Sequence, residues 1–168
     1  GLLEGIEVRT DTDFFKNRDY WDGVAGKIVF TGKIDEYFDY QFGQLEYRSL
    51  RFEHELLEIE NYQGNAVVNY TEYEVPYTRI LEHKHFEFGK QPHTVITREY
   101  PEAWRPGAEP YYPVNDDRNN ALARRYKQLA TGISDKVIFG GRLAEYQYYD
   151  MHQVVAAALK TAKTVTGI

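Results

Sequence analysis

Several residue types and patterns are scarce or absent in this 168-residue sequence. There is no cysteine, which excludes disulfides, thiolate nucleophiles and thiolate metal sites. No apolar run reaches the roughly 20 residues that cross a bilayer. The first residues carry neither the basic region nor the apolar core of a signal peptide. These absences predict no membrane association and a cytoplasmic location.

Positive charge is also scarce, with 20 Lys and Arg against 26 Asp and Glu and a net charge of -6. Because nucleic-acid binding needs a basic face, we expect no nucleic-acid partner. An anionic small ligand is still compatible with this charge, since one or two well-placed arginines can bind a diphosphate. Tyrosine is abundant, at 15 residues. Tyrosines either pack at sheet surfaces, which we expect for most of them, or contact sugars, bases and phosphates.

The order of the hydrophobic patterns predicts an α+β fold. β-rich segments follow one another from residue 45 to 100 without long helices between them, which favours an antiparallel sheet. Pro101 is expected to end the strand before it, and residues 101–114, with four of the six prolines, are expected to form a loop. Strands are predicted at 6–8, 27–31, 49–56, 66–71, 94–100 and 137–139, and helices at 35–41, 117–131 and from about 150.

Two buried strands run directly into glycines, as Val29–Gly32 and Val137–Arg142. Each is either an ordinary tight turn or a place where the backbone approaches a dinucleotide closely. No G-x-G-x-x-G motif is present, so the usual pyrophosphate-binding unit is not among these residues. Asp150 is expected to cap the last helix, whose first amides could also bind an anion.

Three further motifs have a structural and a functional interpretation. Arg79, among β-rich residues, either forks onto a phosphate or pairs with a surface carboxylate. The tyrosines of 99–101 and 110–113, stiffened by prolines, either bind a ligand or pack the loop. His83 and His85 are expected on one strand face, but no third ligand is evident and Lys84 adds positive charge, so no metal site is predicted.

Taken together, the motifs resemble the UDP-galactopyranose mutase family over nearly the whole chain. The resemblance is carried by Thr31–Phe38, Leu45–Phe52, Gln63–Asn69, Pro76–Ile80 with Glu82–Lys84, Glu109–Asn115 and Phe139–Gln153. It implies an isomerase that interconverts UDP-galactopyranose and UDP-galactofuranose with reduced FAD. In that family the flavin N5 attacks the anomeric carbon and displaces UDP, so the cofactor is the covalent catalyst.

The resemblance also implies roles for particular residues. Arg79 and Glu99 match the catalytic residues, and Arg79, Tyr112 and Tyr148 match the ligands of the substrate diphosphate. Tyr111 is the alternative to its neighbour Tyr112. The flavin contacts correspond to Thr31, Gly32, Gly141, Arg142, Asp150 and Met151.

The glycine-rich dinucleotide-binding unit and the helical substrate lid of the family have no counterpart in these residues. The resemblance therefore predicts a C-terminal portion of a mutase, in which about 1–44 and 132–168 belong to the flavin domain and about 45–131 form the substrate-side sheet. We expect this portion alone to retain FAD poorly and to be inactive. The family also suggests a homodimer for a full-length protein.

Overall fold

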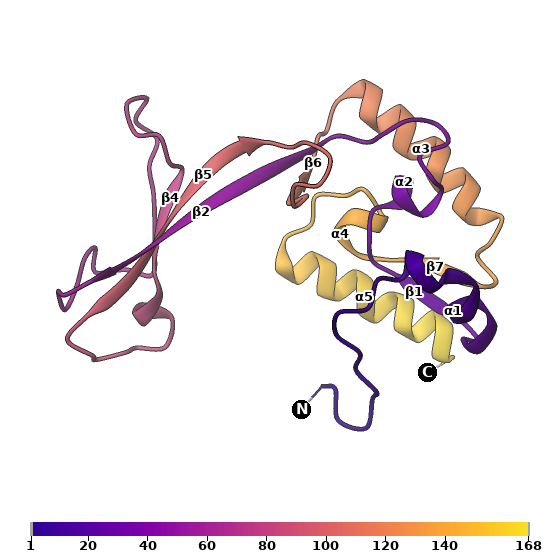
Figure 1. Cartoon of the computed structure of the whole chain (residues 1–168), viewed down its shortest axis with the longest axis horizontal. Coiled ribbons are helices and arrows are strands. Elements are labelled where there is room, and N and C mark those ends of the chain that lie inside the picture. The colour runs from indigo at the N-terminus through magenta and orange to yellow at the C-terminus, as the bar shows by residue number, and fades with distance from the viewer. Residues whose placement is uncertain (1, 168) are drawn as a thin grey trace.

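The computed structural model describes residues 2–167 and confirms an α+β fold. A long antiparallel ribbon extends from a body of helices that surrounds a small parallel sheet (Figure 1). The strands are β1 (Ile28–Phe30), β2 (Tyr47–Leu57), β3 (Val67–Asn69), β4 (Arg79–Glu82), β5 (Thr94–Ala103), β6 (Tyr112–Pro113) and β7 (Val137–Phe139). The α-helices are α1 (Arg18–Val24), α2 (Ile34–Tyr37), α3 (Asp117–Thr131), α4 (Gly141–Ala144) and α5 (Met151–Thr166), and the 3-10 turns are Phe15–Asn17 and His83–Phe86.

The antiparallel sheet has the strand order β3-β4-β5-β2-β6. Its spine is the pairing of β2 with β5, ten residue pairs long from Arg48–Ala103 to Leu57–Thr94. Residues directly opposite each other in such a ladder place their side chains on the same face. The register therefore decides which polar side chains of the ribbon lie together.

The predicted end of β5 at Pro101 is wrong, because the strand continues to Ala103. The Thr78 N–H donates to the Glu99 carbonyl, so at Glu99 the backbone polar groups point toward the β4 side. Pro101 lies two residues later, so its nitrogen, which carries no hydrogen, also faces the β4 side. Because β4 pairs with β5 no further than Glu99, no strand lies opposite Pro101 on that side. Proline is tolerated at such an unpaired edge. The rest of the predicted loop also contains the short strand β6.

Other predicted elements need correction as well. Residues 6–8 form no strand, because no neighbouring strand pairs with them and Ile6 and Val8 stay exposed. The first predicted helix is only Ile34–Tyr37, since Asp39 and Tyr40 adopt positive φ and turn the chain. His83 and His85 belong to a 3-10 turn and not to a strand. The strand predicted at 66–71 is shortened to Val67–Asn69, whereas helix 117–131 and strand 137–139 are confirmed.

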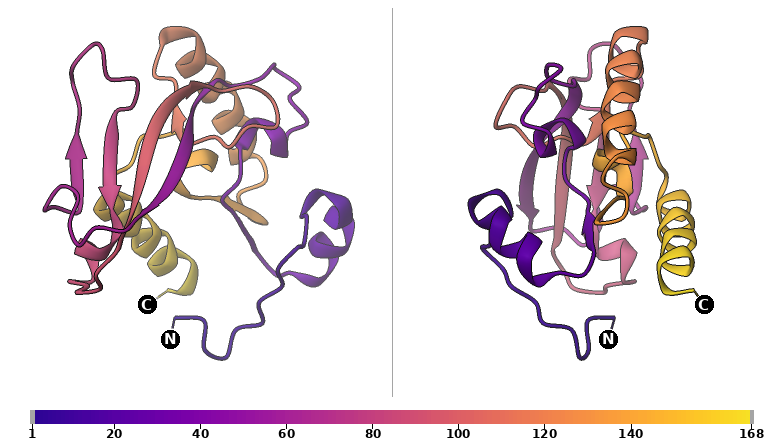
Figure 2. Two further views of the ribbon diagram at one scale, coloured as in Figure 1. Left: turned by 60° about the vertical axis from the view of Figure 1, so that its left-hand side comes forward. Right: turned by 90° about the vertical axis from the view of Figure 1, so that its right-hand side faces the viewer.

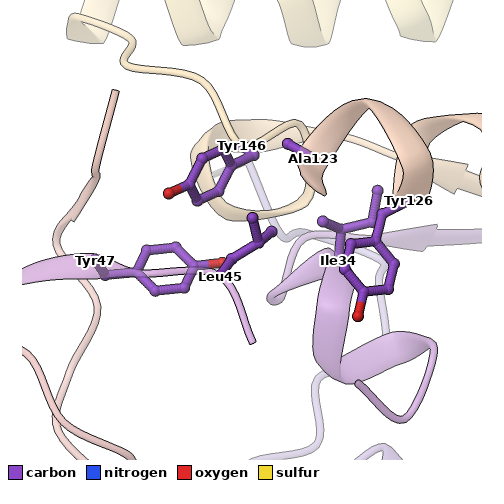
Figure 3. Packing of buried hydrophobic residues seen from close by; sticks show 6 residues of the cluster. All are labelled: Ile34, Leu45, Tyr47, Ala123, Tyr126 and Tyr146. Atoms are coloured by element: carbon purple, nitrogen blue, oxygen red, sulfur yellow. The ribbon is translucent and has the colours of Figure 1, made fainter. Parts of the chain in front are cut away.

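Tyrosines form much of the core that joins the ribbon to the body. The core cluster consists of Ile34, Leu45, Tyr47, Ala123, Tyr126 and Tyr146 (Figure 3). The Tyr126 hydroxyl donates to the Gly43 carbonyl at 2.6 Å, and the Tyr146 hydroxyl donates to the Glu46 carbonyl at 2.6 Å. A buried tyrosine needs such a partner for its hydroxyl. Packing is therefore the role of these tyrosines, as the sequence predicted for most of the fifteen.

The parallel pair β1–β7 organises the other side of the body. Phe30 pairs with Phe139 at the carboxyl ends of the two strands. A second cluster of Phe30, Tyr37, Val137 and Ala144 buries this small sheet against α2 and α4. Both predicted strand-to-glycine turns thus leave the sheet at the same edge.

Helix α5 begins after Asp150, as predicted, and lies at one margin of the molecule in the right-hand view of Figure 2. None of its described residues is buried. Its apolar side borders a groove of about 460 Å³ against the ends of β1 and β7, lined on the helix by Ala157, Ala158 and Ala162. Within residues 2–167, no helix is long and apolar enough to cross a membrane.

A buried carboxylate holds the outer end of the ribbon together. Glu82 is fully buried and accepts hydrogen bonds from the N–H groups of Tyr62 and Gln63 and from the Thr94 hydroxyl, and His85 lies 3.1 Å away. Burial by itself would raise the pKa of Glu82, but the hydrogen bonds from Gln63, Tyr62 and Thr94 outweigh it and lower the pKa to about 2. The charged carboxylate therefore stabilises the folded state.

We predict that Glu82→Gln lowers the free energy of unfolding at pH 7 by on the order of 3 kcal/mol. Because the folded-state pKa lies below the ordinary value of 4.5, the contribution is full above about pH 4.5 and is lost as the pH falls toward 2. Urea denaturation from pH 7 to pH 2 measures this difference. Glu74→Gln, at an exposed loop carboxylate, is the control. A gap between wild type and Glu82→Gln that stays constant with pH would contradict the prediction.

Candidate functional site

The first part of the candidate site is the edge where β1 and β7 end. Thr31 follows β1, and Gly141, with a φ of 86°, begins α4 after β7. A Cβ built on Gly141 would lie 3.9 Å from the Thr31 Cβ, and one built on Gly140 would have no atom within 4 Å. The backbone here is open, and the same residues border the groove under α5. An open backbone at the carboxyl ends of parallel strands suits a dinucleotide such as FAD.

The presence of glycine at position 32 has a structural explanation that is independent of any ligand. A Cβ at this position would lie 2.7 Å from the end of the Phe30 ring, so a side chain would displace part of the second core cluster. Packing against Phe30 therefore favours glycine here. Its predicted contact with the flavin stays a prediction.

Arg142 connects two segments at the inner end of the ribbon. It donates from Nη1 to the Tyr111 carbonyl at 3.2 Å and from Nη2 to the Tyr149 carbonyl at 2.6 Å. Its guanidinium also lies 5.2 Å from the ring centre of Tyr112 and 5.7 Å from that of Tyr148. One predicted flavin contact thus holds the segments that carry two predicted substrate ligands.

Tyr112 and Tyr148, 36 positions apart in the sequence, stack on each other. Their ring centres are 5.4 Å apart and their planes are inclined by 24°. Tyr112 is held by pairing with Arg48 on β2, and half of the Tyr148 surface is exposed. Tyr111, the alternative to Tyr112, instead packs its ring against Phe52. The stack is the arrangement expected if both hydroxyls serve one ligand.

The neighbouring Tyr149 is a poor candidate for an ionised group. A hydrogen bond with the Glu145 carboxylate, together with burial, raises the pKa of Tyr149 to about 12. Tyr149 is therefore a neutral phenol at physiological pH. Its contact with Arg142 is made by its main-chain carbonyl.

Arg79 and Glu99, the predicted catalytic pair, face each other on β4 and β5. Arg79 donates from Nε to the Glu99 Oε1 at 3.0 Å. The Glu99 side chain is 8% exposed and that of Arg79 is 37% exposed. Because the pair uses Nε, the terminal fork of the guanidinium stays available for a phosphate. Both interpretations of Arg79, ion pair and phosphate ligand, are therefore compatible with one geometry.

Phe52 links this pair to the tyrosine stack, and its role was missed at the level of sequence. It lies directly opposite Glu99 on β2, so both side chains project from the same face. Its ring centre is 5.7 Å from that of Tyr111, whose carbonyl binds Arg142. The alternating pattern of 49–56 identified the strand, but only the register shows that Phe52 faces Glu99.

Asp150 and Met151 lie where α5 begins. Asp150 is the N-cap of this helix, and its N–H donates to Gln153 Oε1 at 2.8 Å in a capping box. Met151 is 83% exposed. The capping role is thus confirmed, while contacts of both residues with a flavin stay predictions.

Three histidines of the ribbon serve protein contacts. His54 and His83 both contact the Thr97 hydroxyl, at 2.7 Å and 2.6 Å, and His85 pairs with Glu82. Among the described residues, no group of three or more His, Asp or Glu side chains is placed to hold a metal ion.

Comparison with known proteins gives the family of this chain. Residues 2–148 match the family model described as UDP-galactopyranose mutase. The chain is 40% identical over 164 residues to the UDP-galactopyranose mutase of Mycoplasma pneumoniae and 37% identical over 162 residues to a probable UDP-galactopyranose mutase of Klebsiella pneumoniae, covering 94% and 95% of this chain. It is also 37% identical over 139 residues, or 82% of this chain, to the dTDP-fucopyranose mutase of Escherichia coli.

Each of these relatives is named as a mutase of a nucleotide-linked pyranose, which gives the class of protein. The chain belongs to the UDP-galactopyranose mutase family. The aligned region spans only 40% of the length of the two UDP-galactopyranose mutase relatives and 37% of the dTDP-fucopyranose mutase.

We predict that Arg142→Lys lowers the free energy of unfolding by about 1–2 kcal/mol, because Arg142 reaches its two carbonyls from two separate nitrogens, which the single ammonium nitrogen of lysine cannot reproduce. Chemical denaturation measures the loss, and near-UV circular dichroism reports the disturbed stack of Tyr112 and Tyr148. The control is Arg124→Lys on the exposed side of α3. Equal stability of the two variants would show that Arg142 does not tie the segments together.

Proposed function

We propose that this chain forms the substrate side, and part of the flavin side, of an enzyme that interconverts UDP-galactopyranose and UDP-galactofuranose with reduced FAD. The main support is a series of contacts that begins at Arg79 and Glu99 and passes through Phe52 to Tyr111. Arg142, which binds the Tyr111 carbonyl, then links this series to the stack of Tyr112 and Tyr148. Two sets of residues matched to one substrate are thus connected through side-chain contacts.

In this proposal the substrate diphosphate lies between Arg79 and the tyrosine stack. The free fork of Arg79 binds phosphate oxygens and stabilises the negative charge on departing UDP. Tyr112 and Tyr148 donate their hydroxyls to the same diphosphate. Arg142 keeps the tyrosines in place through its two carbonyl contacts. Glu99 stays close to the sugar, and before the diphosphate binds it orients Arg79 through the Nε contact.

The flavin would be held at the open edge formed by Thr31, Gly32 and Gly141, with Arg142, Asp150 and Met151 beside it. When bound and reduced, FAD supplies the nucleophilic nitrogen for the anomeric carbon. The protein residues position the sugar, exclude water and neutralise the diphosphate.

We further propose the division predicted above, with about 1–44 and 132–168 on the flavin side and about 45–131 on the substrate side. The 168 residues alone are expected to be inactive and to hold FAD poorly, because they contain no G-x-G-x-x-G unit. A cytoplasmic location fits a cysteine-free chain with a nucleotide-sugar substrate, and a homodimer is the proposed assembly of the full-length protein.

A second substrate is favoured by one observation. The dTDP-fucopyranose mutase of Escherichia coli is as similar to this chain, at 37% identity, as the Klebsiella pneumoniae relative. The corresponding reaction on a dTDP-linked fucopyranose is therefore the alternative function.

The decisive experiment compares the 168-residue chain with the full-length product of its gene. Each is reduced with dithionite in the presence of FAD and given UDP-galactofuranose or dTDP-fucofuranose, and the products are separated by chromatography. We expect conversion of the UDP sugar by the full-length product and none by the 168-residue chain. Preference for the dTDP sugar would establish the alternative, and bound flavin without conversion of either sugar would refute both.

We predict that Arg79→Lys weakens UDP binding by the reduced full-length product about tenfold, because lysine offers a point charge in place of a two-pronged donor. Isothermal titration calorimetry measures the affinity. The control is Arg124→Lys on the exposed side of helix α3, which should leave the affinity for UDP unchanged. An affinity of Arg79→Lys equal to wild type would remove Arg79 from the diphosphate site.

A further inference from the structure

Thr78 contacts Glu99 in three ways. Its N–H donates to the Glu99 carbonyl at 2.8 Å. Its hydroxyl lies 3.2 Å from the same carbonyl and 3.2 Å from the carboxylate oxygen Oε1. Thr78 itself is exposed and lies just before β4, where a surface threonine would normally contribute little. Its hydroxyl is nevertheless shared between two oxygens of a buried residue.

The same carboxylate oxygen receives the Arg79 guanidinium. Oε1 of Glu99 accepts from Arg79 Nε at 3.0 Å and from the Thr78 hydroxyl at 3.2 Å. With a side chain only 8% exposed, Glu99 cannot replace a lost donor freely with water. If one of the two donors, Arg79 or Thr78, moves away, the other can still donate a hydrogen bond to Oε1 of Glu99.

We propose that Thr78 is a positioning residue that keeps the Glu99 carboxylate in place when the Arg79 guanidinium turns away from it toward a ligand phosphate. Arg79 has a more exposed side chain than Glu99 and is the member of the pair able to move. Thr78 is fixed by its main-chain bond to Glu99 and stays behind. That Arg79 turns toward a phosphate rests on the function proposed above, whereas the retention of Glu99 by Thr78 does not.

The test uses the 168-residue chain without ligand, so it is independent of mutase activity. Thr78→Val removes the hydroxyl but keeps the branched shape and the main-chain N–H, and Thr78→Ser keeps the hydroxyl as the matched control. Each is made in the wild type, in Arg79→Ala and in Glu99→Gln. Urea denaturation gives the change in the unfolding equilibrium constant.

We expect Thr78→Val to raise the unfolding constant about threefold in the wild type, where Arg79 still satisfies Oε1. In the Arg79→Ala background the same change should raise it about tenfold or more, because Oε1 then loses both donors. In the Glu99→Gln background the effect should fall below about twofold. Thr78→Ser should stay within about twofold of its parent in all three.

An equal effect of Thr78→Val in all three backgrounds would overturn the proposal, because it would show that threonine matters only for the strand. If the variants in the Arg79→Ala background do not fold, the Thr78 variants are made in the Arg79→Lys background instead. There, hydrogen exchange of the Glu99 amide is measured, and Thr78→Val should speed it whereas Thr78→Ser should not. A parallel UDP titration separates the two proposals. Failure of the full-length product to bind UDP would count against the proposed function, while the stability series still decides the role of Thr78.

Discussion

Because β2 and β5 pair over ten residues, the ribbon has one register, and that register places Phe52 opposite Glu99. A shift by one residue would send every side chain of a strand to the other face of the sheet. The Arg79–Glu99 pair continues the same row onto β4. The row of Phe52, Glu99 and Arg79 therefore depends on this pairing, and the buried Glu82 carboxylate holds the outer end of the ribbon together.

The inner end of the ribbon depends on hydrogen bonds from side chains to main-chain carbonyls. The hydroxyls of Tyr126 and Tyr146 bind carbonyls in the segment that leads into β2, and they fix that segment to the body. Arg142 does the same for the two segments that bring Tyr112 and Tyr148 together. An arginine and two tyrosines thus connect distant segments of the chain, next to residues whose proposed role is ligand binding. The parallel strands β1 and β7 supply the adjoining open edge, where the proposed flavin contacts gather.

Much of the secondary structure was predictable, and the misses share a physical cause. Helix 117–131 has a capping aspartate and a 3.6-residue pattern, both of which are local, and it was predicted correctly. Residues 6–8 have a strand-like pattern but no strand to pair with. Proline usually ends a strand, yet Pro101 lies within β5, because its nitrogen faces an edge where no N–H donor is required. In both cases the outcome depends on a neighbouring strand that local sequence does not reveal.

The sequence by itself determined the α+β class, the family resemblance and the identity of the candidate residues, because motifs and hydrophobic periodicity are local properties of the chain. Only the tertiary structure decided which of those residues meet. The stacking of Tyr112 on Tyr148 and the position of Phe52 arise from pairing between distant segments. Thr78 became visible as a partner of Glu99 for the same reason. The chemistry of each side chain can be read from its own residue, whereas strand register and the contacts between loops depend on the packing of the whole chain.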